Sequence, residues 1–352
     1  MNRHLVFDSR AIFVTRHGGP EVLEIEGISL TDPPAGRVLL DTRAVGVNLA
    51  DVYARMGLYD AAPAPPFVPG FEAAGIVRAV GSGVETPRVG DRVAAVTRFG
   101  GYAEMLQVPA WQCIPIPESA GFDEAAGLPT VYATAHYALF RLGELADGMT
   151  VLIHAAAGGV GTAALQLCRL RQVVAIGTVG SPDKSDVARS QGAAHVIDYR
   201  RENLETRVRD LTAGRGVDLV LDSIGGDCFR QSYRLLAPMG RLVTFGAASM
   251  MPAGGRPNWL KLAWQYVMRP RLDPLAMIGE NRSVCGFNLV YLFGERALLT
   301  GTFAELSRLW IEGRVKPLVG AVLPFARAGE AQELLRSRQT TGKVILEVPG
   351  RG

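Results

Sequence analysis

The sequence lacks the residues and runs that several classes of protein require. Its 352 residues include only four cysteines, and no two of these form a Cys-x-x-Cys pair: Cys113, Cys168, Cys228 and Cys285. Neither a zinc ribbon nor a redox dithiol is therefore expected. No apolar run approaches the ~20 residues that cross a bilayer, and the segment Met1–Asp8 has no apolar signal core. We therefore expect a cytoplasmic protein with reduced thiols and no integral membrane span.

An excess of charge of one sign is also missing. The chain has 37 Lys and Arg against 34 Asp and Glu, a formal net charge of +3, and no block of like charges. A nucleic-acid partner is not expected, because such partners require a concentrated basic stripe. The 48% hydrophobic and 20% charged residues are ordinary for a folded chain. The length allows two domains.

The pattern of the chain changes near residue 130. Residues 10 to 120 alternate short apolar stretches with turn clusters such as Pro33–Gly36, which predicts a β-rich domain. The proline-rich segment Ala61–Gly70 is expected to be a loop. After residue 130 a strand, a glycine turn and a helix recur, which predicts a parallel sheet with helices on both faces. The last strand, Gly342–Leu346, is expected to rejoin the first domain. The expected domains are residues 1–128 with 303–352, and residues 129–302.

The individual elements of the second part follow from its apolar runs and glycine turns. The expected strands are Val151–His154, Val173–Ile176, His195–Asp198, Val217–Asp222 and Gly240–Phe245. The expected helices are Thr162–Leu170, Asp183–Gln191, Leu204–Leu211 and, in the tail, Phe303–Glu312.

The strongest motif follows the strand Val151–His154, where the chain reads Ala155-Ala156-Ala157-Gly158-Gly159-Val160-Gly161. Against the dinucleotide fingerprint, Ala156 takes the first glycine position, Gly158 the second and Gly161 the third. The second glycine lets the backbone approach the pyrophosphate, and the third lets the helix pack close to the strand. The N–H groups that open the helix bind phosphate oxygens. With a strand before it and a helix after it, the turn predicts a dinucleotide site.

The end of the next strand discriminates between NADH and NADPH. An NAD enzyme usually carries an acidic residue there for the ribose 2′-hydroxyl. This strand ends in Gly177–Gly180 without a carboxylate, and Ser181 and Lys184, which follow, suit a 2′-phosphate. Asp183 is the exception, although an early helical position lets its carboxylate point elsewhere. Ser181 and its neighbours are also expected to cap the helix. The pattern favours NADPH.

Further segments carry a resemblance to a known family. Gly46–Tyr59 and Val68–Gly75, together with the glycine turn and Gly90–Val93, resemble the medium-chain dehydrogenase/reductase superfamily. The resemblance covers nearly the whole chain in the expected order. It implies an α/β protein with a GroES-like β-rich catalytic domain and a Rossmann domain with a doubly wound parallel sheet.

The resemblance also identifies the positions of the zinc ligands in other members. Alcohol dehydrogenases of this superfamily hold a catalytic zinc by a Cys and a His, and those positions are Asn48 and Phe71 here. A Phe cannot ligate a metal, so no metal is expected. The chain is similar to the zinc-independent quinone oxidoreductases, and within them to the synaptic-vesicle membrane protein (vesicle amine transport protein) group. That likeness includes Cys285–Phe287 and Thr341–Val344.

The resemblance to quinone oxidoreductases implies the cofactor contacts. Asn48 would lie near the nicotinamide, and Ser181, Lys184, Tyr199 and Arg338 near the 2′-phosphate and adenosine. The strand Cys285–Phe287 would approach the cofactor through its backbone and pair across a homodimer. The expected cofactor-binding residues are Asn48, Thr134, Ala156, Gly158, Gly159, Val160, Gly161, Thr178, Ser181, Lys184, Tyr199, Phe245, Gly246, Cys285, Phe287 and Arg338.

A metal-free site suits the reduction of an activated double bond. Hydride transfer to a conjugated carbonyl or quinone collects charge on oxygen, which needs hydrogen-bond donors and a proton source. The candidate catalytic residues are Asn48, Tyr53 and Tyr59 as donors, with Asp51 as an orienting or proton-relay group; solvent is the other proton source. Alternatively, Asn48 and Asp51 cap a helix, and the tyrosines pack under the proline-rich loop. Tyr59 is favoured over Tyr53, because it stands at a tyrosine position in both resembled groups.

Two histidines and one apolar segment leave alternatives open. His136 and His154 are candidate acids, but His154 ends a core strand and a structural role is favoured. The segment Asn258–Arg269 is apolar on one face, and a buried or pocket-lining helix is expected. A lid over the substrate, a dimer contact and a lipid-facing surface are the competing interpretations.

Two functions compete. The favoured one is an NADPH-dependent reductase of quinones or α,β-unsaturated carbonyls with a small hydrophobic substrate. The other is a non-catalytic binder of lipid or a hydrophobic ligand, with peripheral lipid contact.

Overall fold

The computed structural model describes residues 6–251 and 259–350. Met1–Leu5 and Asn258, which entered the expectations above, lie outside the described residues. The chain forms two compact units, residues 1–133 with 290–352 (the first unit) and residues 134–289 (the second unit). The first unit takes in all of α10 (Arg296–Ile311), because this helix packs on β7 (Cys113–Pro115). The second part of the first unit therefore begins at residue 290 rather than at the expected residue 303.

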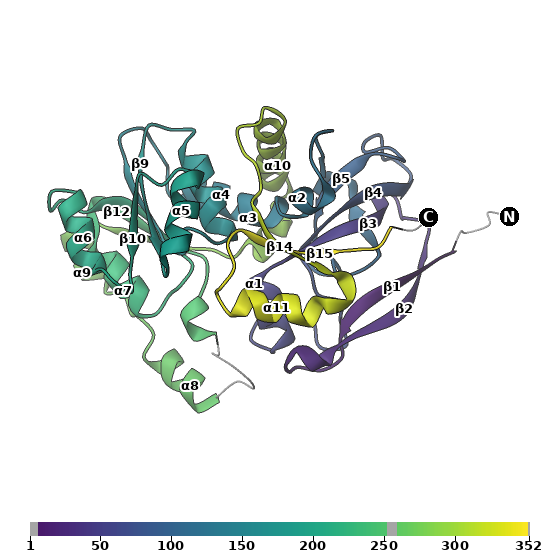
Figure 1. Ribbon diagram of the computed structural model, residues 1–352, viewed down its shortest axis with the longest axis horizontal. Coiled ribbons are helices and arrows are strands. Elements are labelled where there is room, and N and C mark those ends of the chain that lie inside the picture. The colour runs from purple at the N-terminus through teal and green to yellow at the C-terminus, as the bar shows by residue number, and fades with distance from the viewer. Residues whose placement is uncertain (1–5, 252–258, 351–352) are drawn as a thin grey trace. The chain divides into compact units, whose positions relative to one another are not determined.

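The first unit is built on a largely antiparallel sheet with strand order β14-β15-β3-β4-β5-β7, and β6 pairs with β3. Its strands are β3 (Arg37–Val47), β4 (Glu72–Val80), β5 (Arg92–Val96), β6 (Met105–Pro109), β7, β14 (Val319–Pro324) and β15 (Lys343–Glu347). A two-stranded ribbon of β1 (Val6–Val14) and β2 (Leu23–Thr31) also belongs to this unit (Figure 1). The helices are α1 (Leu49–Arg55), α2 (Phe122–Ala126), the start of α3 (Pro129–His136), α10 and α11 (Ala328–Arg336).

The sheet of the first unit encloses an apolar core. Val38, Leu40 and Val45 of β3 are buried, together with Val77 of β4 and Leu346 of β15. The final strand β15 pairs antiparallel with β3, so residues near 345 lie beside residues near 46. The β-rich GroES-like domain that the sequence predicts is confirmed.

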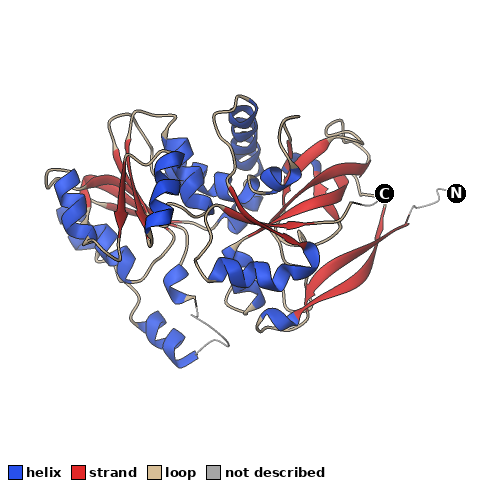
Figure 2. Ribbon diagram, viewed as in Figure 1, coloured by secondary structure: helices blue, strands red, loops and turns tan. Residues whose placement is uncertain are grey.

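The second unit has a six-stranded parallel sheet with the order β10-β9-β8-β11-β12-β13. Its strands are β8 (Thr150–Ile153), β9 (Val174–Val179), β10 (His195–Asp198), β11 (Val217–Asp222), β12 (Leu236–Thr244) and β13 (Ser283–Gly286). Its helices are α4 (Gly159–Cys168), α5 (Pro182–Gln191), α6 (Leu204–Leu211), α7 (Asp227–Arg234), α8 (Trp259–Val267) and α9 (Pro274–Glu280). Helices lie on both faces of this sheet (Figure 2).

The strand order of the second unit locates its ligand-binding edge. From β8 the chain adds β9 and β10 on one side, and then returns to add β11, β12 and β13 on the other. In such doubly wound sheets, ligands bind outside the carboxyl ends of the strands where the order reverses. That point lies between β8 and β11, directly beside the glycine turn. The predicted Rossmann fold is confirmed.

Element bounds agree most closely where apolar runs are isolated by turns. The strands His195–Asp198 and Val217–Asp222 and the helix Leu204–Leu211 have the bounds that the sequence predicts. Helix α4 begins at Gly159 rather than at Thr162, because the glycine turn itself supplies the first helical turn.

The expectation of a buried helix over Asn258–Arg269 is wrong for the residues described, and a pocket-lining role stays a prediction. Helix α8 forms there, but Leu260 is 86% exposed and Trp264 66% exposed. Periodicity identifies the apolar face of a helix but not what covers it. Among the described residues, no helix is long and apolar enough to cross a membrane.

Candidate active site

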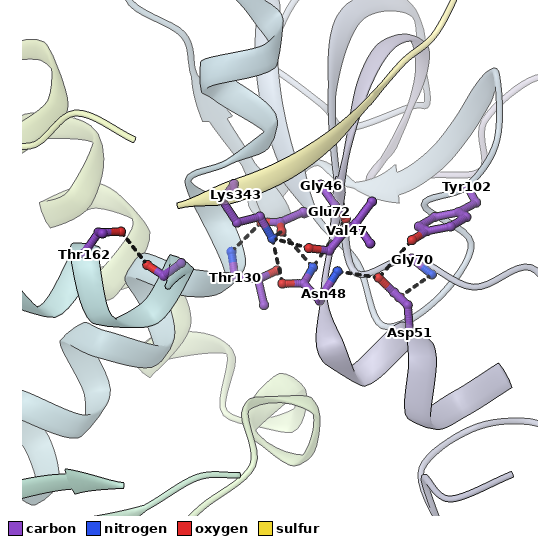
Figure 3. Close-up of polar contacts among 11 residues, drawn as sticks. Gly46, Val47, Asn48, Asp51, Gly70, Glu72, Tyr102, Thr130, Thr162 and Lys343 are labelled. Atoms are coloured by element: carbon purple, nitrogen blue, oxygen red, sulfur yellow. Dashed lines mark hydrogen bonds and ion pairs between the residues drawn. The ribbon is translucent and has the colours of Figure 1, made fainter. Parts of the chain in front are cut away.

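The first polar centre lies where β3 ends and α1 begins. Asn48 is the N-cap residue of α1, and its N–H donates to Asp51 Oδ2 at 2.7 Å. Asp51 Oδ1 accepts the N–H of Gly70 at 3.0 Å, and Oδ2 accepts the Tyr102 hydroxyl at 3.2 Å. The carboxyl of Asp51 therefore joins the start of α1 to the loop before β4 (Figure 3).

The environment of Asp51 decides between its two expected roles. Its side chain is completely buried, and burial raises the pKa of its carboxyl from 3.8 to about 7. The Asn48 N–H, the positive charge of Lys343 and the Tyr102 hydroxyl act in the opposite direction. Burial likewise raises the pKa of Tyr102 well above its usual value. The helix-capping interpretation of Asp51 is therefore supported. With no exposed surface, Asp51 orients the Asn48 backbone and does not reach a substrate.

The side chain of Asn48 belongs to a second set of hydrogen bonds. Its Nδ2 donates to Glu72 Oε1 at 2.8 Å, and its Oδ1 accepts from Lys343 Nζ at 2.8 Å. A longer contact of 3.4 Å joins Nδ2 to the carbonyl of Gly46. The Asn48 residue is 8% exposed. Its amide is thus oriented by two charged neighbours (Figure 3).

Lys343 and Glu72 form an ion pair that is shielded from water. Their side chains are 4% and 0% exposed, with Lys343 Nζ 2.7 Å from Glu72 Oε1. The ammonium also donates to the carbonyl of Val47 at 2.9 Å, and Glu72 Oε2 accepts the N–H of Thr130 at 2.8 Å. The pair therefore links β15, β3, β4 and the first turn of α3.

The sequence interpretation missed Glu72, Lys343 and Thr130. A signal for two of them was present. Lys343 opens an otherwise apolar strand, and Glu72 stands between Phe71 and two alanines. A charged residue in a buried strand must find a partner, because an unpaired buried charge is costly.

The two candidate tyrosines lie in different surroundings. Tyr59 meets the ring of Phe71 edge-on, with centroids 5.9 Å apart, and Phe71 also packs on Phe99 at 5.0 Å. The packing interpretation therefore describes the Tyr59 ring. Burial raises the pKa of Tyr53 to about 12, although the positive charge of Arg338 acts in the opposite direction. Tyr53 thus keeps its proton and lies within electrostatic reach of Arg338.

Phe71 belongs to this aromatic cluster. It stands at the position where the resemblance places a zinc-ligating histidine in alcohol dehydrogenases. It is 5% exposed. In the described part of the chain, no group of three or more His, Cys, Asp or Glu side chains is placed to hold a metal ion.

The glycine turn of the second unit has the local geometry that a dinucleotide fingerprint requires. Gly158 is the N-cap residue of α4, so Gly159, Val160 and Gly161 form its first turn. A Cβ at Gly161 would overlap the Ala155 carbonyl oxygen and lie 2.7 Å from Ala156 Cα, whereas a Cβ at Gly158 would lie 3.2 Å from its nearest neighbour, the Ala155 carbonyl oxygen. The third glycine is therefore needed for packing, and the second leaves the backbone open to a ligand.

His154 and Thr178 are held in a buried hydrogen-bonded group. His154 Nδ1 lies 3.0 Å from Thr178 Oγ1, and Nε2 lies 2.8 Å from Ser232 Oγ. Burial lowers the pKa of the imidazole, although Asp222 opposes this shift. The structural role expected of His154 is supported. Thr178 is 2% exposed, and its carbonyl accepts the N–H of Ala156 at 3.0 Å; its cofactor contact stays a prediction.

The expected 2′-phosphate residues gather where β9 passes into α5. Ser181 is the N-cap residue of α5, but its side chain makes no capping hydrogen bond. Asp183 is exposed and Lys184 half-buried. Tyr199 is 51% exposed, and its hydroxyl lies beside Gly180, where an added Cβ would be 2.5 Å away. The capping expected of the Ser181 side chain is therefore absent.

A group of aromatic rings follows β12. Phe245 lies 5.8 Å from Phe287, centroid to centroid, and Phe287 lies 4.9 Å from Tyr137. Cys285 of β13 pairs with Val243 of β12. The remaining expected cofactor residues are placed as follows: Gly246 follows Phe245, Thr134 is 8% exposed on α3, and Asn48 and Arg338 belong to the first unit.

Comparisons with known proteins agree with this geometry. A family model described as an alcohol dehydrogenase GroES-like domain matches residues 34–118, and one described as a zinc-binding dehydrogenase matches residues 191–346. The human synaptic vesicle membrane protein VAT-1 homolog is 39% identical over 97% of this chain and 86% of its own length. The chain belongs to the medium-chain dehydrogenase/reductase family. The quinone oxidoreductase of Pseudomonas aeruginosa is 37% identical over 96% of this chain and 99% of its own.

Solved structures of this family support the same placement. The quinone oxidoreductase of Escherichia coli, complexed with NADPH, has a TM-score of 0.84 and 33% identity over 96% of this chain and 99% of its own. The human VAT-1 homolog-like protein has a TM-score of 0.83 and 30% identity over 98% of this chain and 99% of its own. The predicted likeness to the quinone oxidoreductase branch and to the vesicle-protein group is confirmed.

Proposed function

We propose that this protein is a zinc-independent, NADPH-dependent reductase of quinones or α,β-unsaturated carbonyls. The observation that carries the proposal is the centre around Asn48. At the position of a zinc-ligating cysteine in other members, an amide is hydrogen-bonded to a buried lysine and a buried glutamate. This arrangement offers polar hydrogens to a substrate rather than ligands to a metal.

The glycine turn and the start of α5 support NADPH as the cofactor. The open side of Gly158 and the first turn of α4 suit a pyrophosphate. Ser181, Lys184 and Tyr199 would hold the 2′-phosphate and adenosine. A relative from Escherichia coli forms a complex with NADPH.

The residues of this chain would divide the chemistry as follows. When bound, NADPH supplies a hydride from its nicotinamide ring. Asn48 donates a hydrogen bond to the substrate oxygen on which charge develops, and Tyr59, the favoured tyrosine, or Tyr53 is a second donor. The high pKa of Tyr53 keeps its phenol protonated. Solvent delivers the final proton, because Asp51 is too deeply buried to do so.

The proposal is tested by cofactor titration and turnover. We expect NADPH to bind at least about tenfold more tightly than NADH, a difference of about 1.4 kcal/mol. Lys184→Ala should remove most of that preference and leave NADH affinity unchanged. Arg189→Ala, on the same helix in an exposed ion pair with Asp186, is the matched control. Binding of NADPH without turnover across a panel of quinones and enones would contradict the reductase.

One observation favours the alternative of a non-catalytic lipid binder. Leu260 and Trp264 of α8, and Leu275 and Ile278 of α9, are each at least 66% exposed. Exposed apolar side chains of this size are suited to an interface with lipid. The alternative would be supported if the protein floats with phosphatidylserine vesicles and has no reductase activity. The variant Leu260→Ser/Trp264→Ser should then no longer float. Absent flotation and absent co-purified lipid would exclude it.

A further inference from the structure

The orientation of the Asn48 amide is dictated by the chemistry of its two charged neighbours. An ammonium group can only donate hydrogen bonds, so the amide atom 2.8 Å from Lys343 Nζ must be the oxygen. A carboxylate can only accept them, so the atom 2.8 Å from Glu72 Oε1 must be the nitrogen. Exchanging the two amide atoms would therefore break both bonds.

This orientation leaves Asn48 with one underused hydrogen. One N–H of Nδ2 is engaged by Glu72, and within the described ranges the other makes only the 3.4 Å contact with the Gly46 carbonyl. That distance is longer than the ~2.7–3.2 Å of an ordinary N–H···O bond. The oxygen already accepts from a cation, which polarises the amide and strengthens its N–H groups as donors. Asn48 is thus prepared to donate.

Exposure singles out Asn48 within this group. Glu72 and Lys343 have side-chain exposures of 0% and 4%, whereas the Asn48 residue is 8% exposed. The ion pair therefore acts on a ligand through Asn48. Gly46 leaves room for this arrangement, because a Cβ there would lie 2.5 Å from Glu72 Oε1.

Stability alone does not account for the buried pair. Two charges lose their hydration on burial, and apolar residues of similar volume are often equally or more stabilising. What an apolar pair cannot do is distinguish the two ends of an amide. Lys343 and Glu72 are also fixed by backbone bonds to Val47 and Thr130, so their positions are well determined.

We infer that Lys343, together with Glu72, is a positioning residue of the reductase: it orients the Asn48 amide so that an N–H is offered to the substrate oxygen. The kinetic part of this inference rests on the proposed function, since it needs an oxygen on which charge develops. The orientation of the amide in the protein is independent of it.

The orientation is tested by NMR of the full chain labelled with ¹⁵N-asparagine. The Asn48 side-chain signals are assigned by their loss in Asn48→Ala. We expect the two Nδ2 hydrogens to be well separated in chemical shift in the wild type, because only one is bonded to a carboxylate. Lys343→Met should reduce that separation, and Lys343→Arg should retain it. Unchanged Asn48 signals in Lys343→Met would overturn the inference.

The kinetic role is tested by a double-mutant cycle of Asn48→Ala and Lys343→Met, with saturating NADPH and a quinone. We expect Lys343→Met to lower kcat by about 10- to 100-fold, less than the ~100- to 1000-fold of a removed oxyanion donor, because the Asn48 amide is misoriented rather than lost. In the Asn48→Ala background the same change should cost less than about twofold, because Lys343 acts through Asn48. An equal loss in both backgrounds, or a wild-type kcat in Lys343→Met, would overturn the role.

A charge-free variant separates folding from positioning. Lys343→Met alone leaves the Glu72 carboxylate buried without its counter-charge, which by itself lowers the stability of the variant. Glu72→Met/Lys343→Met removes both charges and keeps the volume, so we expect it to fold and to show the same loss of kcat. Wild-type kcat in this variant would overturn the inference. If the wild type turns over no acceptor, the proposed function fails, and the NMR result still decides the orientation.

Discussion

The buried carboxyl of Asp51 makes stability depend on pH in a defined direction. Its pKa rises from 3.8 in the unfolded chain to about 7 in the folded one, so the folded protein binds its proton more tightly. Between about pH 4 and 7, folding should therefore become less favourable as pH rises, by up to about 1.4 kcal/mol per pH unit. Urea unfolding tests this prediction. The unfolding free energy of the wild type minus that of Asp51→Asn should fall as pH rises and become constant above about pH 7.

The control for this prediction is the same substitution at a solvent-exposed aspartate. Asp186→Asn, at a side chain that is 87% exposed, should give a difference that is flat over the same range. A difference for Asp51→Asn that rises with pH would show that the three hydrogen-bond donors outweigh burial.

At the scale of an element, alanine substitutions at the two glycines of the turn before α4 should affect different properties, stability in one case and cofactor binding in the other. A Cβ at Gly161 meets backbone atoms at 2.7 Å, so Gly161→Ala should lower the unfolding free energy by about 2–4 kcal/mol. A Cβ at Gly158 meets its nearest neighbour at 3.2 Å, so Gly158→Ala should cost less than about 1 kcal/mol. Its effect should instead be on the cofactor, because the added methyl stands where the pyrophosphate approaches.

Thermal unfolding and NADPH titration of both variants separate the two effects. We expect Gly158→Ala to bind NADPH at least about tenfold more weakly. The reverse pattern, with a stable Gly161→Ala and an unstable Gly158→Ala, would contradict the assigned roles of the two glycines.

Helices, strands and turns could be predicted where neighbouring residues in the sequence determine them. The strand His195–Asp198 and the turn at Gly158 are encoded by neighbouring residues, and the structure has both. The polar centre was only half predictable. Asn48 and Asp51 are three residues apart, whereas Lys343 is 271 residues from Glu72. Periodicity carries no information about such distant pairs, nor about what covers the apolar face of α8.

At the scale of the whole molecule, the edge strand β13 supports the proposed homodimer. Within the described residues β13 pairs only with β12, and an edge strand of this kind can add a second sheet across a two-fold axis. Phe287 donates its N–H to Thr244 of β12. Because N–H directions alternate along a strand, the N–H of Val284 points to the outer side.

A substitution at Val284 therefore tests the dimer without breaking the β12–β13 pairing. Light scattering of the wild type should give twice the 37.7 kDa of one chain. Val284→Pro should shift the mass toward the monomer, since proline removes the outward N–H, while Val284→Ala keeps it and should remain dimeric. A monomeric wild type, or a dimeric Val284→Pro, would contradict the β13 interface.

The pairing of β15 with β3 also sets an order of events during synthesis. The second unit is continuous in sequence, from Thr134 to Leu289, whereas Lys343 reaches back 296 residues to Val47. A growing chain can thus complete its nucleotide-binding unit while Glu72 still awaits its counter-charge. The amide that we place at the substrate is among the last groups to gain its native contacts. A chain that ends before β15 would therefore keep all the strands of its Rossmann sheet and lack the Lys343 contacts to Asn48 and Glu72.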